Sequence, residues 1–133
     1  MSQYLNQLLK LSNSYGVICH DAGGANQIIA LHQKYGYEPS RIFVDGPAKV
    51  LWDSNFPGES RYSLDLSWIE QASLIVTGTG WESDVEHKAR KIAQEFKVPS
   101  VAILDHWTNF RERFIRNGEE VLPNEFWVVD DYA

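Results

Sequence analysis

The sequence predicts an α/β domain of the Rossmann-like class, in which helices cover both faces of a parallel sheet. Five short apolar runs each end in small or charged residues, and these runs are 17–19, 42–44, 74–76, 101–104 and 126–129. Helical patterns lie between most of them, and this alternation is typical of βαβ units. We expect a single Rossmann-like domain over residues 1–133, a three-layer sandwich around a parallel five-stranded sheet in the order 3-2-1-4-5.

Each segment between the first three strands carries a signal of its own. Residues 1–13 place leucines at helical spacing, which predicts an amphipathic helix ahead of the first strand. Residues 25–36 repeat this pattern and end in a glycine, which is a good helix terminator. Short helices are expected over 47–53 and around 66–70. Between these two lies an irregular loop, 54–63, in which Asn, Pro and Gly gather.

The clearest helical pattern spans residues 83–96, after the third strand. Its apolar residues form one stripe, made of Val85, Ala89, Ile92, Ala93 and Phe96. The pairs Asp84–Lys88 and Glu86–Arg90 stand four residues apart in the favourable acid-first order. We therefore expect a stable amphipathic helix that packs its stripe on the sheet.

Composition excludes several classes of function. A net charge of −6 argues against binding to nucleic acid or to an anionic membrane surface. No apolar run approaches the ~20 residues that a membrane span needs, and no signal peptide is recognisable. Cys19 is the only cysteine, so there is no disulfide framework, and we expect it to be an inert core thiol. These features predict a cytoplasmic protein.

The first candidate ligand site follows the first strand, because ligands of parallel sheets bind outside the carboxyl ends of the strands. Gly23 and Gly24 let the backbone approach a ligand, and the amides of the helix start favour an anion beside Asp21. Alternatively, the glycines only permit a tight turn. Asp45 ends the second strand, where it either binds a ribose hydroxyl or forms a turn.

The third strand ends in a second glycine-rich turn, 77–83. Thr79, Gly80 and Glu82 offer hydroxyl, backbone and carboxylate contacts that suit a neutral polyol such as a sugar. The acids in the first turn of the helix that follows disfavour phosphate at this position. Alternatively, the same residues only cap the helix.

The turn after the fourth strand is the densest in polar and aromatic residues. Asp105 and His106 form a candidate acid/base pair, since histidine titrates near neutral pH. Asn109 and Arg111 are candidate ligand-binding residues, and the arginine suits a carboxylate or a phosphate. Alternatively, the aromatic residues here are core and the arginines are solvated. The four histidines show no metal-ligand spacing, although His20, Asp21, Asp105 and His106 could meet if the first and fourth strands are adjacent. We expect neither a metal nor another cofactor.

The chain resembles the N-terminal Rossmann-like half of GT-B glycosyltransferases and of the related UDP-N-acetylglucosamine 2-epimerases of polysaccharide biosynthesis. The matching parts are the glycine-rich turn 20–24, the Thr-Gly-Thr-Gly turn 77–80, and the segment 98–101 that leads into Asp105 and His106. The resemblance implies that this half binds the acceptor or forms one wall of an interdomain cleft. It also implies that a second Rossmann half, outside these residues, holds most of the donor nucleotide.

The leading hypothesis is a domain that binds a sugar or a nucleotide-sugar, with glycosyltransferase-like or epimerase-like activity left open. The competing hypothesis is a non-catalytic α/β ligand-binding or assembly module. In the expected strand order the first and fourth strands are neighbours, so Gly23 and Asp105 face one crevice. No helical pattern follows the fifth strand near Trp127, so either the N-terminal helix covers this flank or a partner does. We expect a homodimer or a partner domain at the Ala133 flank.

Overall fold

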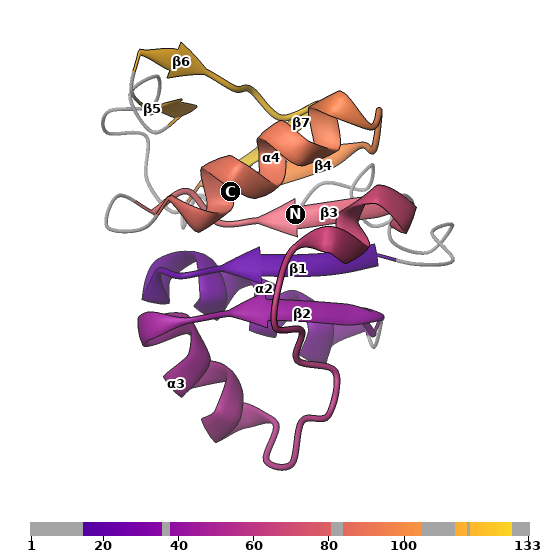
Figure 1. Cartoon of the computed structure of the whole chain (residues 1–133). Coiled ribbons are helices and arrows are strands. Elements are labelled where there is room, and N and C mark those ends of the chain that lie inside the picture. Colours follow the sequence, from indigo (N-terminus) through magenta and orange to yellow (C-terminus); the bar gives the residue numbers. More distant parts are fainter. Residues whose placement is uncertain (1–14, 36–37, 81–83, 105–113, 117, 129–133) are drawn as a thin grey trace.

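A five-stranded parallel sheet forms the centre of the protein. The structure is a computed structural model that describes residues 15–35, 38–80, 84–104, 114–116 and 118–128. The sheet has the order β2-β1-β3-β4-β7 (Figure 1). Its strands are β1 (Tyr15–Cys19), β2 (Arg41–Val44), β3 (Leu74–Thr77), β4 (Ser100–Leu104) and β7 (Glu125–Val128). The prediction of an α/β, Rossmann-like architecture is confirmed at this level.

The predicted strand order, 3-2-1-4-5, is wrong. β1 pairs with β2 on one side and with β3 on the other, so β1 and β4 are not neighbours. The outer edge of β2 is already occupied: the N–H of Ile42 donates to Arg61 O at 3.1 Å, and the N–H of Ser63 donates to Ile42 O at 2.8 Å. With that edge taken by the loop, β3 pairs with the free edge of β1. The order therefore reverses between β1 and β3.

Two helical layers cover the sheet. On one face, α2 (Ala22–Tyr35) and α3 (Gly46–Asn55) share a core cluster with β1 and β3. On the other, α4 (Val85–Glu95) and the 3₁₀ helix η1 (Ser67–Gln71) share a second cluster. In Figure 1, α4 lies in front of the sheet and α2 behind it. The four helices predicted after the first strand are thus present, whereas the helix expected over 1–13 lies outside the described residues.

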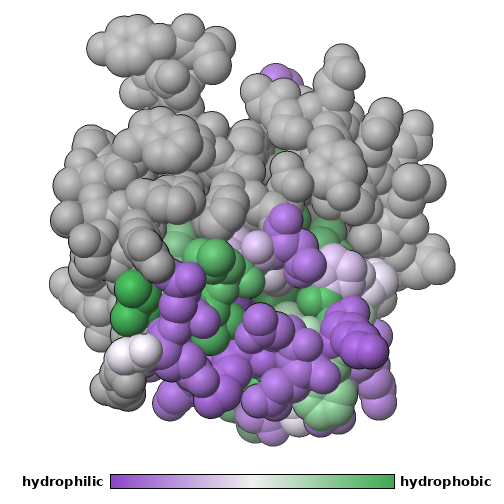
Figure 2. Space-filling model, turned by 90° about the horizontal axis from the view of Figure 1, so that it is seen from above, coloured by the Kyte–Doolittle hydropathy of each residue, from purple (hydrophilic) through white to green (hydrophobic). Residues whose placement is uncertain are grey.

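A small antiparallel pair, which the sequence did not predict, packs beside α4. It joins β5 (Ile115–Arg116) to β6 (Glu119–Glu120) across Gly118, whose φ of 77° suits glycine. On the side of the molecule where these elements lie, the described surface mixes hydrophilic with hydrophobic residues (Figure 2). The side chain of Trp127, on which the homodimer prediction depends, lies outside the described part of the structure.

Gly16, the second residue of β1, is required by the packing of η1. A Cβ atom at this position would lie 2.0 Å from the Trp68 ring. We expect Gly16→Ala to lower the free energy of unfolding by about 1–3 kcal/mol, because the ring must move. Urea unfolding measures the loss. The double variant with Trp68→Ala is expected to lose less than the two single variants together, and strict additivity would contradict this contact.

Candidate functional site

Two glycine-containing turns meet at the carboxyl ends of β1 and β3, where the strand order reverses. Gly24 lies in the first turn of α2, and a Cβ on it would come within 3.1 Å of the Gly78 Cα. The two turns therefore pack backbone against backbone. Ligand sites of open α/β sheets form at such a reversal point. The candidate crevice thus lies between the first and third turns, and not between the first and fourth as the sequence predicted.

Two carboxyl groups pack against the Gly78–Gly80 turn, and they explain both of its glycines. A Cβ on Gly78 would lie 2.2 Å from Glu86 Oε2, and a Cβ on Gly80 would lie 2.3 Å from the carboxyl carbon of Asp21. The N–H of Gly80 also donates to Glu86 Oε1 at 2.9 Å. Any side chain at either glycine would displace a carboxyl group.

Buried hydrogen bonds also fix the same turn to α4 and to β4. Arg90 Nη1 donates to Thr77 Oγ1 and to Gly78 O, both at 3.0 Å. The Thr79 hydroxyl donates to Ile103 O at 3.1 Å and is buried. The sequence predicts an i,i+4 pair of Glu86 with Arg90 on a helix, and both residues prove to be buried beneath the turn.

His20 and Asp45 form a pair at the ends of β1 and β2. His20 Nδ1 lies 2.7 Å from Asp45 Oδ1. A Cβ on Gly46 would come within 2.4 Å of the imidazole, so this glycine, with φ of 53°, makes room for the ring. Burial by itself lowers the pKa of His20, but the hydrogen bond and the charge of Asp45 outweigh it, so the pKa is raised. Asp45 therefore orients His20 and favours its charged form.

Glu86 is a strongly perturbed acid of the site. Its side chain is 1% exposed, and burial raises its pKa to about 7 against the opposing effects of the Gly80 N–H and Arg90. Among the described residues, no N–H or O–H group donates a hydrogen bond to Glu86 Oε2. Burial also raises the pKa of the Cys19 thiol, and the Glu86 charge adds to this effect. The prediction that Cys19 is a buried thiol is confirmed.

A hollow of about 730 Å³ opens beside this crevice, on the α4 face of the sheet. Its lining is half polar and half apolar, and consists of His20, Phe43, Leu64, Asp65, Leu66, Asp84, Val85 and Lys88. His20 thus belongs both to the hollow and to the pair with Asp45. The arrangement suits a ligand with hydroxyl groups and an apolar face.

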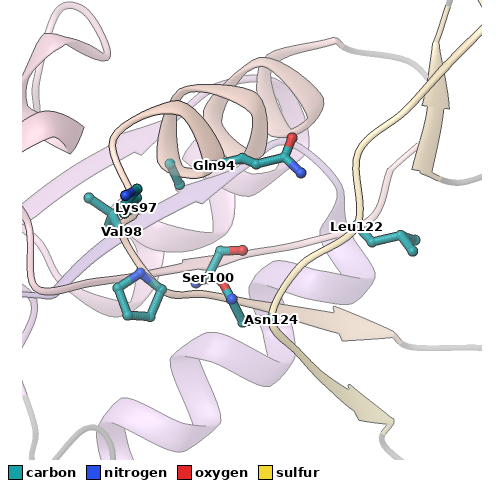
Figure 3. A pocket seen from close by; sticks show the side chains of 8 residues that line it. Gln94, Lys97, Val98, Ser100, Leu122 and Asn124 are labelled. Carbon is teal, nitrogen blue, oxygen red and sulfur yellow. Dashed lines mark hydrogen bonds between the residues drawn. The ribbon is translucent and has the colours of Figure 1, made fainter.

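A smaller hollow of about 280 Å³ lies at the opposite edge of the sheet, between the end of α4 and the start of β4 (Figure 3). There the N–H of Ser100 donates to Asn124 Oδ1 at 3.0 Å, so these two groups already satisfy each other. Lys97 is the only ionisable side chain among the described residues that line it. The concentration of titratable groups therefore favours the crevice at the carboxyl ends of the strands.

The structure brings part of the predicted site together. Five predicted ligand-binding residues lie in the two turns of the crevice, namely Asp21, Gly23, Gly24, Thr79 and Gly80. The other predicted site residues lie outside the described part of the chain, namely Glu82, Asp105, His106, Asn109 and Arg111.

Sequence reasoning missed the roles of Glu86 and Arg90 and the pairing of His20 with Asp45. A signal was present for Glu86, which precedes Ala89 and Ala93 of the apolar stripe by three and seven residues and so shares their face of the helix. For His20 and Asp45 the signal was weaker, because each only ends a strand. Their pairing requires β1 and β2 to be adjacent.

Neither metal-binding clusters nor membrane spans appear in the described residues. No three of their His, Cys, Asp and Glu side chains are grouped to hold a metal ion. None of the helices in the described ranges has the length and apolar character to cross a membrane. Comparison of the chain with protein-family models, with curated proteins and with solved structures finds no match. The assignment of a function therefore depends on the chemistry of the crevice.

Proposed function

We propose that this domain binds a sugar, free or as part of a nucleotide-sugar, in the crevice between β1 and β3 and in the adjoining hollow. The observation that carries the proposal is the gathering of His20, Asp21, Asp45 and Glu86 beside a hollow of mixed polarity. The resemblance of the glycine-rich turns to those of glycosyltransferases and sugar-nucleotide epimerases supports it.

The charges of the site favour hydroxyl groups over phosphate. Asp21 and Asp45 accept hydrogen bonds from hydroxyls but repel anions. Asp65 and Asp84 extend the acidic lining into the hollow, where Lys88 is the only Lys or Arg among the described lining residues. The sugar of a nucleotide-sugar therefore fits the crevice, and its phosphates fit the rim near Lys88.

The apolar part of the hollow complements a sugar ring. Phe43 and Leu66 are half-buried, and the Leu64 side chain is fully exposed. An exposed leucine beside a polar crevice offers an apolar surface to the C–H face of a sugar. Sites for small ligands commonly combine such apolar walls with a few polar groups that fix orientation.

His20 is the group best placed for chemistry on a bound sugar. With Nδ1 held by Asp45, its Nε2 is oriented as a base for a sugar hydroxyl. A glycosyltransferase-like or epimerase-like reaction would use such a base. Binding without turnover would instead identify the domain as a non-catalytic binding module.

Asp21→Asn tests the site directly. The chain is titrated with neutral sugars, UDP-sugars, UDP and inorganic phosphate, and binding is followed by NMR and calorimetry. We expect sugar-bearing ligands to bind and Asp21→Asn to weaken them about tenfold or more, because a charge-assisted hydrogen bond is lost. Glu95→Gln, at an exposed position on α4, is the matched control and should bind as the parent does.

Two results would refute the sugar site. One is binding of phosphate or UDP that is equally tight with and without a sugar. The other is sugar binding that Asp21→Asn leaves unchanged while the fold is intact by circular dichroism.

A further inference from the structure

Glu86 has a place in the crevice that sugar binding by itself does not explain. It lies in the first turn of α4, which runs from Val85 to Glu95, yet its side chain turns inward and is 1% exposed. An acid in the first turn of a helix ordinarily stays at the surface, where it complements the helix dipole. The buried position of this carboxyl group requires another reason.

The two oxygens of Glu86 have different surroundings. Oε1 accepts the hydrogen bond from the Gly80 N–H at 2.9 Å. Oε2 lies at the space beside Gly78 on which the Cys19 sulfur also converges, and in the described part of the chain it accepts no hydrogen bond from an N–H or O–H group. Burying a neutral carboxyl group there costs less free energy than burying a carboxylate, which leaves one charged oxygen without a hydrogen bond from an N–H or O–H group.

Groups of both signs face this carboxyl. Arg90 approaches from the same helix and favours the charged form. Asp21 disfavours that form and His20 favours it, both from the turn after β1. Cys19 of β1 is adjacent as a neutral thiol. Burial outweighs the lowering effects of the Gly80 N–H, Arg90 and His20, so the pKa rises to about 7.

We infer that Glu86 is a positioning residue of the proposed sugar site. Its carboxyl group holds the Gly78–Gly80 turn against Asp21, and gain or loss of its proton changes the strength of the hydrogen bond that holds this turn. The role of Glu86 in a sugar site rests on the proposed function. The coupling between its proton and the Gly78–Gly80 turn rests on the contacts alone. Ionisation strengthens the hydrogen bond from Gly80, because charged acceptors bind more strongly. It also places a second negative charge beside Asp21.

NMR of the ligand-free protein tests this inference. The Gly80 amide signal and the His20 imidazole signals are followed from about pH 5 to pH 9, a range that spans both groups. We expect the Gly80 amide to shift with a midpoint near pH 7. Glu86→Gln should keep the hydrogen bond through its amide oxygen, abolish the shift, and lower the pKa of His20 because a nearby negative charge is removed. Glu95→Gln is the matched control and should titrate like the parent.

This NMR titration needs no sugar, so its result does not depend on whether the proposed function is correct. A Gly80 amide that stays constant across the titration of the parent protein would overturn the inference, even if Glu86→Gln failed to fold. A Gly80 amide that still titrates near pH 7 in a folded Glu86→Gln variant would overturn it as well. If sugar binding is established, affinity should change across the same pH range in the parent and not in Glu86→Gln.

Discussion

Replacement of Arg90 by Met is expected to lower the free energy of unfolding by about 3–5 kcal/mol, the range for removing one member of a buried charged network. The Arg90 side chain is 2% exposed and donates two hydrogen bonds, to Thr77 Oγ1 and to Gly78 O. Its guanidinium also lies 4.9 Å from the centre of the Phe114 ring. Methionine fills much of the volume but leaves the carbonyl of Gly78 without this donor.

Lys91→Met is the matched control for Arg90→Met. Lys91 is the next residue on α4, and its Nζ lies 3.2 Å from Glu119 Oε1, with both side chains about half exposed. Exposed ion pairs contribute roughly 0–1 kcal/mol. Urea unfolding of the two variants should therefore separate them clearly, and equal losses would show that burial of Arg90 adds nothing to stability.

The stability of the parent protein is expected to fall, relative to Glu86→Gln, as the pH rises from 4.5 to about 7. The Glu86 pKa is raised from 4.5 to about 7 in the folded state. Between these values the folded state holds a proton that the unfolded state has lost, so each rise in pH favours unfolding. At about 1.4 kcal/mol per pH unit, the difference between the two proteins should change by about 3 kcal/mol over this range. Above pH 7 the difference should stay constant.

Denaturant unfolding of both proteins at several pH values measures this difference. The comparison removes the contribution of His32, because that residue is present in both proteins. Burial lowers the pKa of His32, so its contribution runs the other way and is lost as the pH falls below about 6.5. A difference that stays flat between pH 4.5 and 7 would mean that Glu86 is already ionised in the folded protein.

Local sequence patterns were sufficient to predict the class of fold and the positions of the five sheet strands and of the helices in the described chain, but not the β5–β6 pair. Alternation of apolar runs with helical stripes is a local property, and it located the strands and the helices over 22–35, 46–55 and 85–95 within a few residues. The same reasoning brought Asp21 and Gly80 to one edge of the sheet, because every parallel strand ends there.

Which turns meet depends on how the strands pair in three dimensions. The strand order depends on the loop at 61–63, which hydrogen-bonds along the outer edge of β2 and leaves β3 to pair with β1. That choice moves the crevice to the turns after β1 and β3, and it brings Asp21 to Gly80. The burial of Glu86 likewise follows from the rotation of α4 on the sheet. Pairing and burial join residues far apart in the chain, so no local pattern encodes them, and the chemistry of the crevice emerges only in three dimensions.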